Sequence, residues 1–546
     1  MKNTERTELK SEKSSDLPEK NRQKGVDSSV KQVAPSSGLL RSSSVVGSMT
    51  MLSRVLGLVR DIVIARYFGA GAGADAFFVA FKIPNFLRRL FAEGAFSQAF
   101  VPVLSEYRAK KELRDVRVLI NSVAGVLGMV LLVVTLLAVA GSPVLTTIFA
   151  PGFIDEAEKF SLASEMLRLT FPYLLLISLT AFAGSILNSY GRFAVPAFTP
   201  VLLNLCLIAS AIWLSPLFEH PIIAMAWGVL IAGMLQLFFQ FPFLLKLGLM
   251  PRPRLDYRHE GVARIMRLML PALFGVSVSQ INLLLDTVLA SFLQTGSVSW
   301  LYYSDRLSEL PLGVFGVAIA TVILPSLSRK HTSESSEAFS KTLDWALRIV
   351  LVIGFPAAVA LLLLAEPLLA TLFYHGELTE LDVTMSTLSL RAYASGLMAF
   401  MLIKVLAPGY FSRQDTKTPV KIGVIAMVVN MVFNLILIWP LAHTGLALAT
   451  ALSAWLNAYL LYRGLLKEGV YWLQEGWRKF LFQLLFSLLV MSGVLLVLLQ
   501  FLPSWLLMSV VERVAYLALV VVSGGASYFI ALYLSGIRLR AFLARH

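Results

Sequence analysis

Long apolar segments, separated by short polar ones, make up the chain after about residue 40. Stretches such as residues 126–140 are rich in Leu, Val and Ala and lack the alternation of polar and apolar positions that membrane barrel strands need, so they predict membrane-spanning helices. About 20 apolar residues suffice for one span. Windows of that length predict fourteen helices, near residues 45–67, 75–104, 118–141, 163–188, 194–215, 221–247, 262–293, 297–328, 342–365, 385–411, 418–440, 443–465, 477–502 and 509–536.

Basic residues alternate between the two sides of these predicted spans. Lys and Arg gather in every second connection, as in residues 108–117 and 413–421, whereas the other connections are short or acidic, as in residues 155–158 and 377–382. Basic connections face the cytoplasm in membrane proteins. The pattern therefore predicts that both ends of the chain are cytoplasmic. The polar segment 1–40, which lacks a signal-peptide core, is predicted to be a disordered cytoplasmic tail.

Short segments of the chain match one another at a nearly constant offset. The matching pairs are PVLS (residues 102–105) with PSLS (325–328), NSYGR (188–192) with GYFSR (409–413), and LLKLG (244–248) with LLKEG (465–469). An offset of six predicted helices keeps both copies in the same orientation, as in transporters with parallel halves. We therefore expect an all-α integral membrane protein with two pseudo-symmetric six-helix lobes, at residues 41–250 and 251–470. Two extra C-terminal helices would lie at residues 471–546.

Composition agrees with a membrane protein and excludes several other classes. Hydrophobic residues make up 57% and charged residues 15% of the chain, whereas soluble domains carry roughly 45–50% and about 25%. The net charge of +14 comes from cations at helix ends rather than from a clustered basic face, which argues against nucleic-acid binding. The single Cys206 excludes a disulfide framework. Because Walker, Rossmann and zinc-type His patterns are missing from the sequence, we expect no cofactor.

Four arginines lie inside segments that are otherwise apolar enough to span a bilayer: Arg54, Arg60, Arg88 and Arg306. A charge at bilayer depth costs about 2.5–3.5 kcal/mol on insertion scales, so it normally faces a protein interior or a water-filled cavity. The guanidinium stays charged when desolvated and donates in parallel to phosphate or carboxylate oxygens. A surplus of such cations predicts a cavity for an anionic ligand.

In the first predicted span, Arg54 and Asp61 are seven residues apart and share a helix face, whereas Arg60 lies about 120° round the helix. An internal pair of Arg54 with Asp61, which merely neutralises itself, is the alternative to a ligand site. Such a pair would leave Arg60 pointing elsewhere.

Four charged residues of the second predicted span share one stripe if the helix is straight: Asp75, Lys82, Arg89 and Glu93. Pro84 removes a backbone donor and crowds the previous turn, which predicts a kink. The kink leaves open whether Arg88 or Arg89 faces the cavity. Snorkelling of both arginines to the membrane interface is the alternative.

The eighth predicted span carries Asp305, Arg306 and Glu309. Arg306 and Glu309 are one turn apart on a face shared with Tyr302, and this pair could be purely structural. However, this span is the repeat-mate of the second, so both halves bring charge to an equivalent depth. That symmetry favours a shared central site.

A second polar cluster joins three further spans. It consists of Asp286 in the seventh span, Asn430 and Asn434 in the eleventh, and Thr450 in the twelfth. One carboxylate with amide and hydroxyl oxygens could hold a monovalent cation such as Na⁺, which would then be a coupling ion. Hydrogen bonding between helices is the alternative.

Four charged runs closely resemble those of the MurJ (MviN) family of bacterial lipid II flippases. They are SMTMLSRVLGLVRD (48–61), GAGAGADAFFVAFKIPNFLRRLFAEGAFSQAFVP (69–102), GSVSWLYYSDRL (296–307) and LAPGYFSRQDTKTP (406–419), and the likeness runs from about residue 40 to the C-terminus. Within the larger group of multidrug, oligosaccharidyl-lipid and polysaccharide exporters, the resemblance implies a V-shaped pair of lobes that alternate between inward- and outward-facing states.

The resemblance also assigns roles to individual residues. It implies that the substrate is bound by Arg54, Arg60, Asp75, Arg88 and Arg306. Further charges of the predicted cavity are Asp61, Lys82, Arg89, Glu93, Asp305 and Glu309. The last two helices would form an apolar groove for a polyprenyl tail, which fits their position outside the repeat.

We therefore expect a flippase in the bacterial cytoplasmic membrane that moves lipid II, the undecaprenyl-diphosphate-linked peptidoglycan precursor, from the cytoplasmic to the periplasmic leaflet. No covalent bond changes, so we expect a transporter and not an enzyme. Its partners would be lipid II and membrane lipids, with the cell-wall synthesis machinery as a further candidate. An ion-coupled exporter of drugs or of other polyprenyl-linked oligosaccharides, with the same fold, is the alternative. A membrane-embedded glycosyl- or acyltransferase would need catalytic clusters that the acidic loops lack.

Overall fold

The computed structural model describes residues 37–313 and 336–538, and every regular element in these two ranges is a helix. The all-α prediction is therefore confirmed for this part of the chain. Helices satisfy their backbone hydrogen bonds internally, as a segment in lipid must. The sequence-based predictions for residues 1–36, 314–328 and 539–546, including one partner of the repeat match at residue 325, lie outside the described residues.

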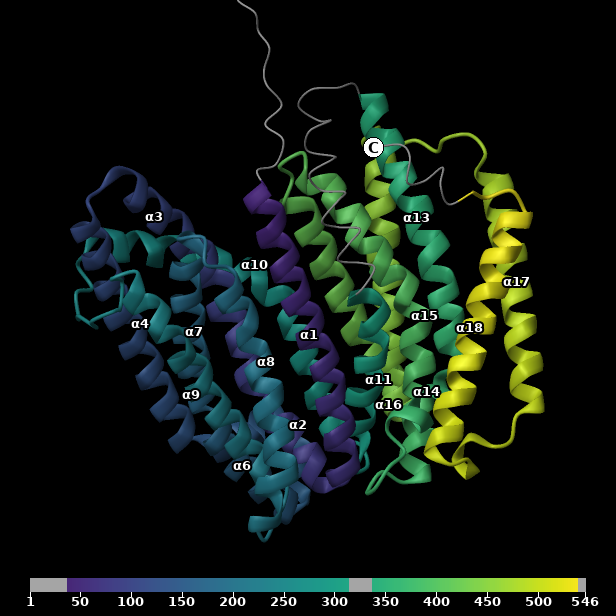
Figure 1. The fold of residues 1–546 in the computed structure, drawn as a ribbon, viewed down its shortest axis with the longest axis horizontal. Helices are drawn as coiled ribbons and strands as arrows, with labels where there is room; N and C mark the ends of the chain where they lie inside the picture. Colours follow the sequence, from purple (N-terminus) through teal and green to yellow (C-terminus); the bar gives the residue numbers. More distant parts are fainter. Residues whose placement is uncertain (1–36, 314–335, 539–546) are drawn as a thin grey trace, which may run out of the picture.

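The first half of the chain forms a bundle that is drawn in purple to blue-green in Figure 1. Its elements are α1 (Ser37–Phe68), α2 (Ala72–Arg88), the π-helical η1 (Arg89–Phe96), α3 (Ser97–Lys110), α4 (Leu113–Ala140), α5 (Ser142–Phe149), the 3₁₀ turn η2 (Pro151–Asp155), α6 (Ala157–Thr170), α7 (Pro172–Ser189), α8 (Ala194–Ala209), η3 (Ser210–Leu214), η4 (Ser215–Leu217) and α9 (Ile223–Lys246).

The second half forms a neighbouring bundle, with a helical hairpin at its outer edge (Figure 1). Its elements are α10 (Glu260–Ser291), α11 (Ser297–Pro311), α13 (Ser336–Leu363), α14 (Ala365–Leu372), α15 (Glu380–Phe411), α16 (Lys417–Lys467), α17 (Trp477–Phe501), the turn η6 (Trp505–Leu507) and α18 (Val510–Leu534). α16 consists of two helices, because Ala442 between them has a φ of 48°.

Within the described ranges, nine helices are long and apolar enough to cross a membrane, so the chain is a multi-pass membrane protein. They include α4, α9, α13, α17 and α18, near the positions that the hydropathy of the sequence predicts. The helices that carry the charged residues of interest, α1, α2, α10 and α11, are not among the nine. α2 and α11, with 17 and 15 residues, are also shorter than the nine.

Helix α10 joins the two bundles. It packs against η1 and α3 of the first half and against α16 of the second. Its first turns complete a separate apolar core, in which Val262 and Ile265 meet Phe100, Phe182 and Leu244. An ion pair between Arg264 and Glu106 of α3, with 2.7 Å between nitrogen and oxygen, fixes this end of α10 from outside. The first helix after the predicted lobe boundary is thus shared between the halves.

The second predicted span departs from a straight helix over more residues than the proline kink alone would affect. α2 passes through Pro84 and ends at Arg88, and the chain then makes π-helical turns through Phe96 before α3 begins. π-helical turns add residues to a turn and shift the helix faces that follow. The stripe predicted for a straight helix is therefore broken after Arg89. The side chain of Glu93 lies outside the described part of the structure.

Candidate functional site

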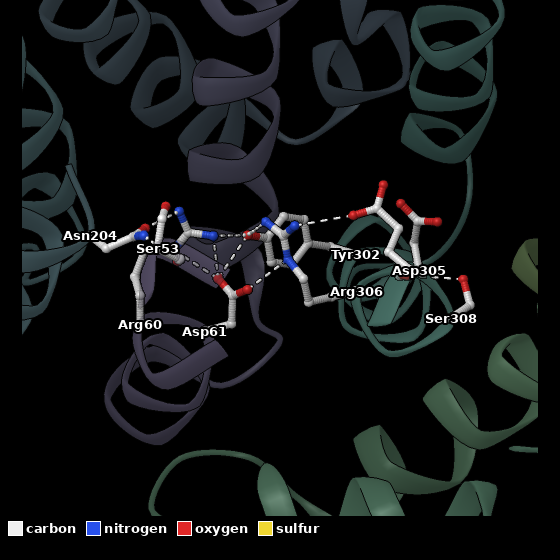
Figure 2. Close-up of polar contacts among 9 residues, drawn as sticks. Ser53, Arg60, Asp61, Asn204, Tyr302, Asp305, Arg306 and Ser308 are labelled. Atoms are coloured by element: carbon white, nitrogen blue, oxygen red, sulfur yellow. Dashed lines mark hydrogen bonds and ion pairs between the residues drawn. The ribbon is translucent and has the colours of Figure 1, made fainter. Parts of the chain in front are cut away.

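Asp61 of α1 lies between arginines from the two halves of the chain (Figure 2). Its Oδ1 accepts hydrogen bonds from Nε and Nη2 of the adjacent Arg60, at 2.9 and 2.6 Å. Its Oδ2 lies 2.7 Å from Nε of Arg306 in α11. The Asp61 carboxylate is fully buried. One acidic group therefore bridges a pair of cations across the interface of the halves and leaves one positive charge in excess.

Tyr302 of α11 completes this network. Its hydroxyl donates to Asp61 Oδ1 at 2.9 Å and accepts from Nη2 of Arg60 at 3.0 Å and from Nη2 of Arg306 at 3.3 Å. Its ring stacks on Phe78 of α2, with 3.9 Å between the ring centroids. The tyrosine therefore fixes the distance between the two guanidinium groups.

Arg60 is also held from the other side. Its Nη1 donates to Oδ1 of Asn204 in α8 at 3.1 Å, and the Asn204 amide donates in turn to the Ser53 carbonyl at 2.9 Å (Figure 2). Only 6% of the Arg60 side chain is exposed, against 33% of the Arg306 side chain. Arg60 is thus a fixed group, whereas Arg306 can be reached from the cavity.

A cavity of about 310 Å³ borders this network. Its charged lining residues are Arg60, Lys82, Arg88, Arg89, Arg306, Asp286, Asp305 and Glu309. Five cations thus face three carboxylates in the lining, and with Asp61 behind Arg60 and Arg306 a positive charge still remains in surplus, so the cavity favours an anion. Both Arg88 and Arg89 belong to the lining, and Arg88 donates to the Asn85 side chain at 3.2 Å. Both arginines thus border the cavity.

Two predicted site arginines differ in their surroundings. Arg306 donates to Glu309 at 3.2 Å, which confirms the expected pairing one turn apart. Arg54 is exposed and lies beside Gly313 at the end of α11, where a side chain at residue 313 would collide with its guanidinium. It lies about 10 Å from Asp61 along α1, towards the start of the helix. The alternative pairing of Arg54 with Asp61 was wrong, because Arg60 and Arg306 occupy that carboxylate.

Asp75 lies away from the cavity lining and binds the two halves together. Its carboxylate accepts from the Gly296 N–H at 2.7 Å and from the Ser299 N–H and hydroxyl at 2.9 and 2.6 Å. Asp75 belongs to α2 and therefore caps the first turn of α11 from a different helix. The first N–H groups of a helix have no partner within it, so they favour a negative charge at that position. Lys159 of α6, which is 2% exposed, lies 3.5 Å from the carboxylate.

Further contacts close the same end of the bundle, where α1 ends and α2 begins. Tyr303 donates to the Gly69 carbonyl at 2.7 Å, and the Glu377 N–H donates to the Arg66 carbonyl at 3.0 Å. Gly69 has a φ of 59° and approaches the Glu377 carbonyl so closely that a side chain at residue 69 would clash. The two halves thus meet at backbone level here.

The polar cluster predicted around Asp286 is present. The Asn434 amide donates to Asp286 at 2.7 Å and to Asn430 at 3.0 Å, and the Thr450 hydroxyl lies 3.5 Å from the second oxygen of Asp286. The Asn430 amide donates to Thr450 at 3.4 Å. These bonds join α10 to both parts of α16, as the helix-pairing alternative predicts, and Asn434 meets Asp286 through its amide nitrogen rather than its oxygen.

Several functional candidates escaped the sequence analysis. Asn204 touches Arg60, and Ser299 and Lys159 touch Asp75, but each is far from its charged partner in the sequence. For Lys159, the available signal was a single lysine directly after the acidic loop, but nothing in the sequence pairs it with Asp75. Helical spacing places Tyr302 beside Arg306, but it does not reveal the contacts of Tyr302 with Arg60 and Asp61.

Comparisons with known proteins give one consistent result. A family model described as "Lipid II flippase MurJ" matches residues 64–516. A protein of Vibrio cholerae named "Probable lipid II flippase MurJ" is 53% identical over 93% of this chain and 98% of its own length. One of Burkholderia cenocepacia named "Lipid II flippase MurJ" is 41% identical over 93% of this chain and 99% of its own.

Solved structures agree with the sequence matches. A structure described as "Lipid II flippase MurJ, inward closed conformation" aligns with a TM-score of 0.77 and 28% identity, over 90% of this chain and 99% of its own. An inward-facing multidrug resistance MATE family transporter of the MOP superfamily aligns with a TM-score of 0.62 and 15% identity, over 78% of this chain and 98% of its own. The second likeness concerns the fold alone.

Proposed function

The chain belongs to the MurJ family of lipid II flippases, and we propose that it carries lipid II by binding the diphosphate between arginines of its two halves. It is a transporter and not an enzyme. The observation that supports this mode of binding is the convergence of Arg60 and Arg306 on one buried point beside a cavity with surplus positive charge.

The chemistry of the cavity suits a diphosphate. A guanidinium donates in parallel to two oxygens and stays charged without water, so several of them can replace the hydration of a dianionic group. Arg88 and Arg89 extend the basic lining along α2 and η1. Arg54 lies outside this lining, exposed and nearer the start of α1. We assign Arg306 and Arg60 to the diphosphate, and Arg54, Arg88 and Arg89 to the entering anionic headgroup.

The transport cycle is proposed to be alternating access between the two lobes. The contacts of Asp75, Ser299 and Lys159 close one end, and their rupture would open it. A cationic cavity responds to the membrane potential, because moving one charge across 100 mV is worth about 2.3 kcal/mol. Asp75 is thus proposed to act on the conformational step, rather than by touching the substrate in this state.

We further propose fourteen spans in the bacterial cytoplasmic membrane, with both chain ends in the cytoplasm. Helix α1 begins and helix α18 ends at the same end of the bundle, as an even number of spans requires (Figure 1). With basic connections on the cytoplasmic side, the end closed by Asp75 is periplasmic. The cavity would then load from the cytoplasm.

The hairpin of α17 and α18 is proposed to hold the polyprenyl tail. It lies at the edge of the second bundle, and it exposes large apolar side chains such as Phe482, Phe486, Val522 and Phe529. Apolar surface exposed in this way requires lipid or an apolar ligand to cover it. The tail would remain in this environment while the charged headgroup crosses.

Cells that depend on this protein provide the test of the binding site. Arg54, Arg60, Arg88 and Arg306 are replaced singly by Ala in the only copy of the gene, and growth is measured together with the amount of folded protein in the membrane. We expect loss of growth for Arg60→Ala and Arg306→Ala at normal protein levels. Full growth with all four variants would contradict the proposed arginine site.

A further inference from the structure

The two central arginines already hold an anion that belongs to the protein. Asp61 accepts two hydrogen bonds from Arg60, and its second oxygen lies 2.7 Å from Arg306. A carboxylate presents two oxygens to a guanidinium much as a phosphate does. Asp61 therefore occupies the position in which the proposed function places an oxygen of the diphosphate.

We propose that Asp61 is an internal counter-anion, which the diphosphate of the substrate must displace from Arg306 before it can bind. This inference rests on the proposed function and concerns the same site. Asp61 is a positioning residue: it sets how available the arginines are, and it does not itself recognise the ligand.

The exchange takes place at Arg306 because its contact with Asp61 is the more open one. The Arg306 side chain is 33% exposed, and its Nε faces Oδ2 of Asp61 without the alignment of a hydrogen bond. Arg60, by contrast, is held by Asp61, Tyr302 and Asn204. A ligand that enters the cavity can therefore recruit Arg306 first, while the contacts with Tyr302 and Asn204 keep Arg60 in place to bind the same ligand.

Such an exchange links ligand binding to the interface of the halves. Asp61 and Arg60 belong to α1, whereas Arg306 and Tyr302 belong to α11. When the diphosphate takes Arg306, one contact between the halves is lost, and when the product leaves, Asp61 restores it. Only molecules in which Arg306 is free of Asp61 can bind the ligand. The apparent affinity is therefore the intrinsic affinity multiplied by the fraction of such molecules. This weaker binding would favour release of the substrate into the periplasmic leaflet.

The proposal differs measurably from a purely structural role of Asp61. If Asp61 served only to neutralise buried arginines, its removal would disturb their positions and weaken anion binding. If it competes with the ligand, its removal strengthens binding and slows turnover. The direction of the change in affinity therefore separates the two roles.

The test measures binding of inorganic pyrophosphate to the purified full-length protein by calorimetry, for the wild type, Asp61→Asn and Asp305→Asn. The Asp305 variant is a matched control, because it removes the same charge from the lining of the same cavity without touching Arg60. We expect Asp61→Asn to bind about tenfold tighter than the wild type and Asp305→Asn to change the affinity much less. Flipping of lipid II by Asp61→Asn in liposomes should be slower than by the wild type.

Each outcome of this test supports or overturns the counter-anion role of Asp61 or the arginine site itself. Equal or weaker binding by Asp61→Asn, with measurable binding by the wild type, overturns the counter-anion and leaves the arginine site standing. Equal tightening by Asp305→Asn also overturns it, because general charge then explains the effect. Absence of binding in all three proteins contradicts the proposed arginine site as well. If Asp61→Asn does not fold, Arg60→Gln is compared with Arg60→Gln/Asp61→Asn, in which the second change should still tighten binding.

Discussion

Asp75 on α2 and Ser299 on α11 are joined by two hydrogen bonds, from the serine hydroxyl at 2.6 Å and from its N–H at 2.9 Å. Both groups are buried, and they come from different halves of the chain. Charge-assisted hydrogen bonds contribute about 1.5–3 kcal/mol each. This one carboxylate therefore contributes much of the free energy that holds the closed end together.

The variant Asp75→Asn should open that end. We expect a cysteine at Val298, which lines the cavity, to react at least about tenfold faster with a membrane-impermeant maleimide added outside intact cells, because 1.5 kcal/mol corresponds to about that factor. The protein would carry Cys206→Ser, so that no other thiol reacts. Glu156→Gln is the control, since Glu156 also pairs with Lys159 but is 45% exposed. Unchanged labelling in Asp75→Asn would show that its contacts do not keep the end closed.

A lysine at position 306 should not support the function of Arg306. Lysine keeps the charge but loses the planar fork that reaches Tyr302, Glu309 and Asp61 together. We expect Arg306→Lys to lower the rate of lipid II flipping in liposomes by at least about tenfold at an unchanged unfolding temperature. The same change at Arg391, an exposed arginine of α15, is the matched control and should have no effect. A fully active Arg306→Lys would mean that charge alone suffices.

Arg513 should hold the α17–α18 hairpin against α14 and the residues that follow it. Its guanidinium is buried and donates to the carbonyls of Trp505, Leu506, Ala370 and Tyr374, at 2.8 to 3.2 Å. Replacement by Met removes these donors and leaves buried carbonyls without partners, which should cost about 3 kcal/mol.

Thermal unfolding of the purified protein measures this loss. We expect a clearly lower unfolding temperature for Arg513→Met. The matched control is Arg478→Met at an exposed position of α17, which should unfold as the wild type does. Equal unfolding temperatures for the two variants would refute the role of Arg513 in the fold.

The cluster around Asp286 should make transport depend on a monovalent cation. Asp286 and Thr450 bring oxygens from α10 and the second part of α16 together, and Asn434 of the first part holds the carboxylate through its amide N–H. We expect flipping in liposomes to fall when Na⁺ is replaced by choline, and Asp286→Asn to abolish this dependence. Transport that is indifferent both to Na⁺ and to Asp286→Asn would leave the cluster with a purely structural role.

Local rules explain which parts of the structure could be predicted. Hydropathy located the apolar helices, since length and composition determine them, and helical spacing predicted the pair of Arg306 with Glu309. The contact of Asp286 with Asn434 followed from the same kind of argument, because few polar groups occur at that depth. Each of these results depends on neighbours along one helix or on the scarcity of partners.

The central network could not be predicted in this way. Helical spacing favoured Arg54 as the partner of Asp61, but a long arginine side chain can fold back to the adjacent residue, as Arg60 does. The second partner, Arg306, comes from the other half, and no periodicity encodes the packing that brings it there. The π-helical turns after Arg88 likewise moved the predicted stripe of charges on the second span.

Exposure of lipid II on the outer face of the membrane tests the central claim most directly. Cells that lack any second flippase are depleted of this protein, and an enzyme that cleaves lipid II is added from outside, with wild-type or Arg306→Ala protein supplied from a plasmid. We predict that depletion abolishes cleavage and that the wild type restores it, whereas Arg306→Ala does not. Undiminished cleavage after depletion would contradict the assigned transport, and full restoration by Arg306→Ala would contradict the arginine site.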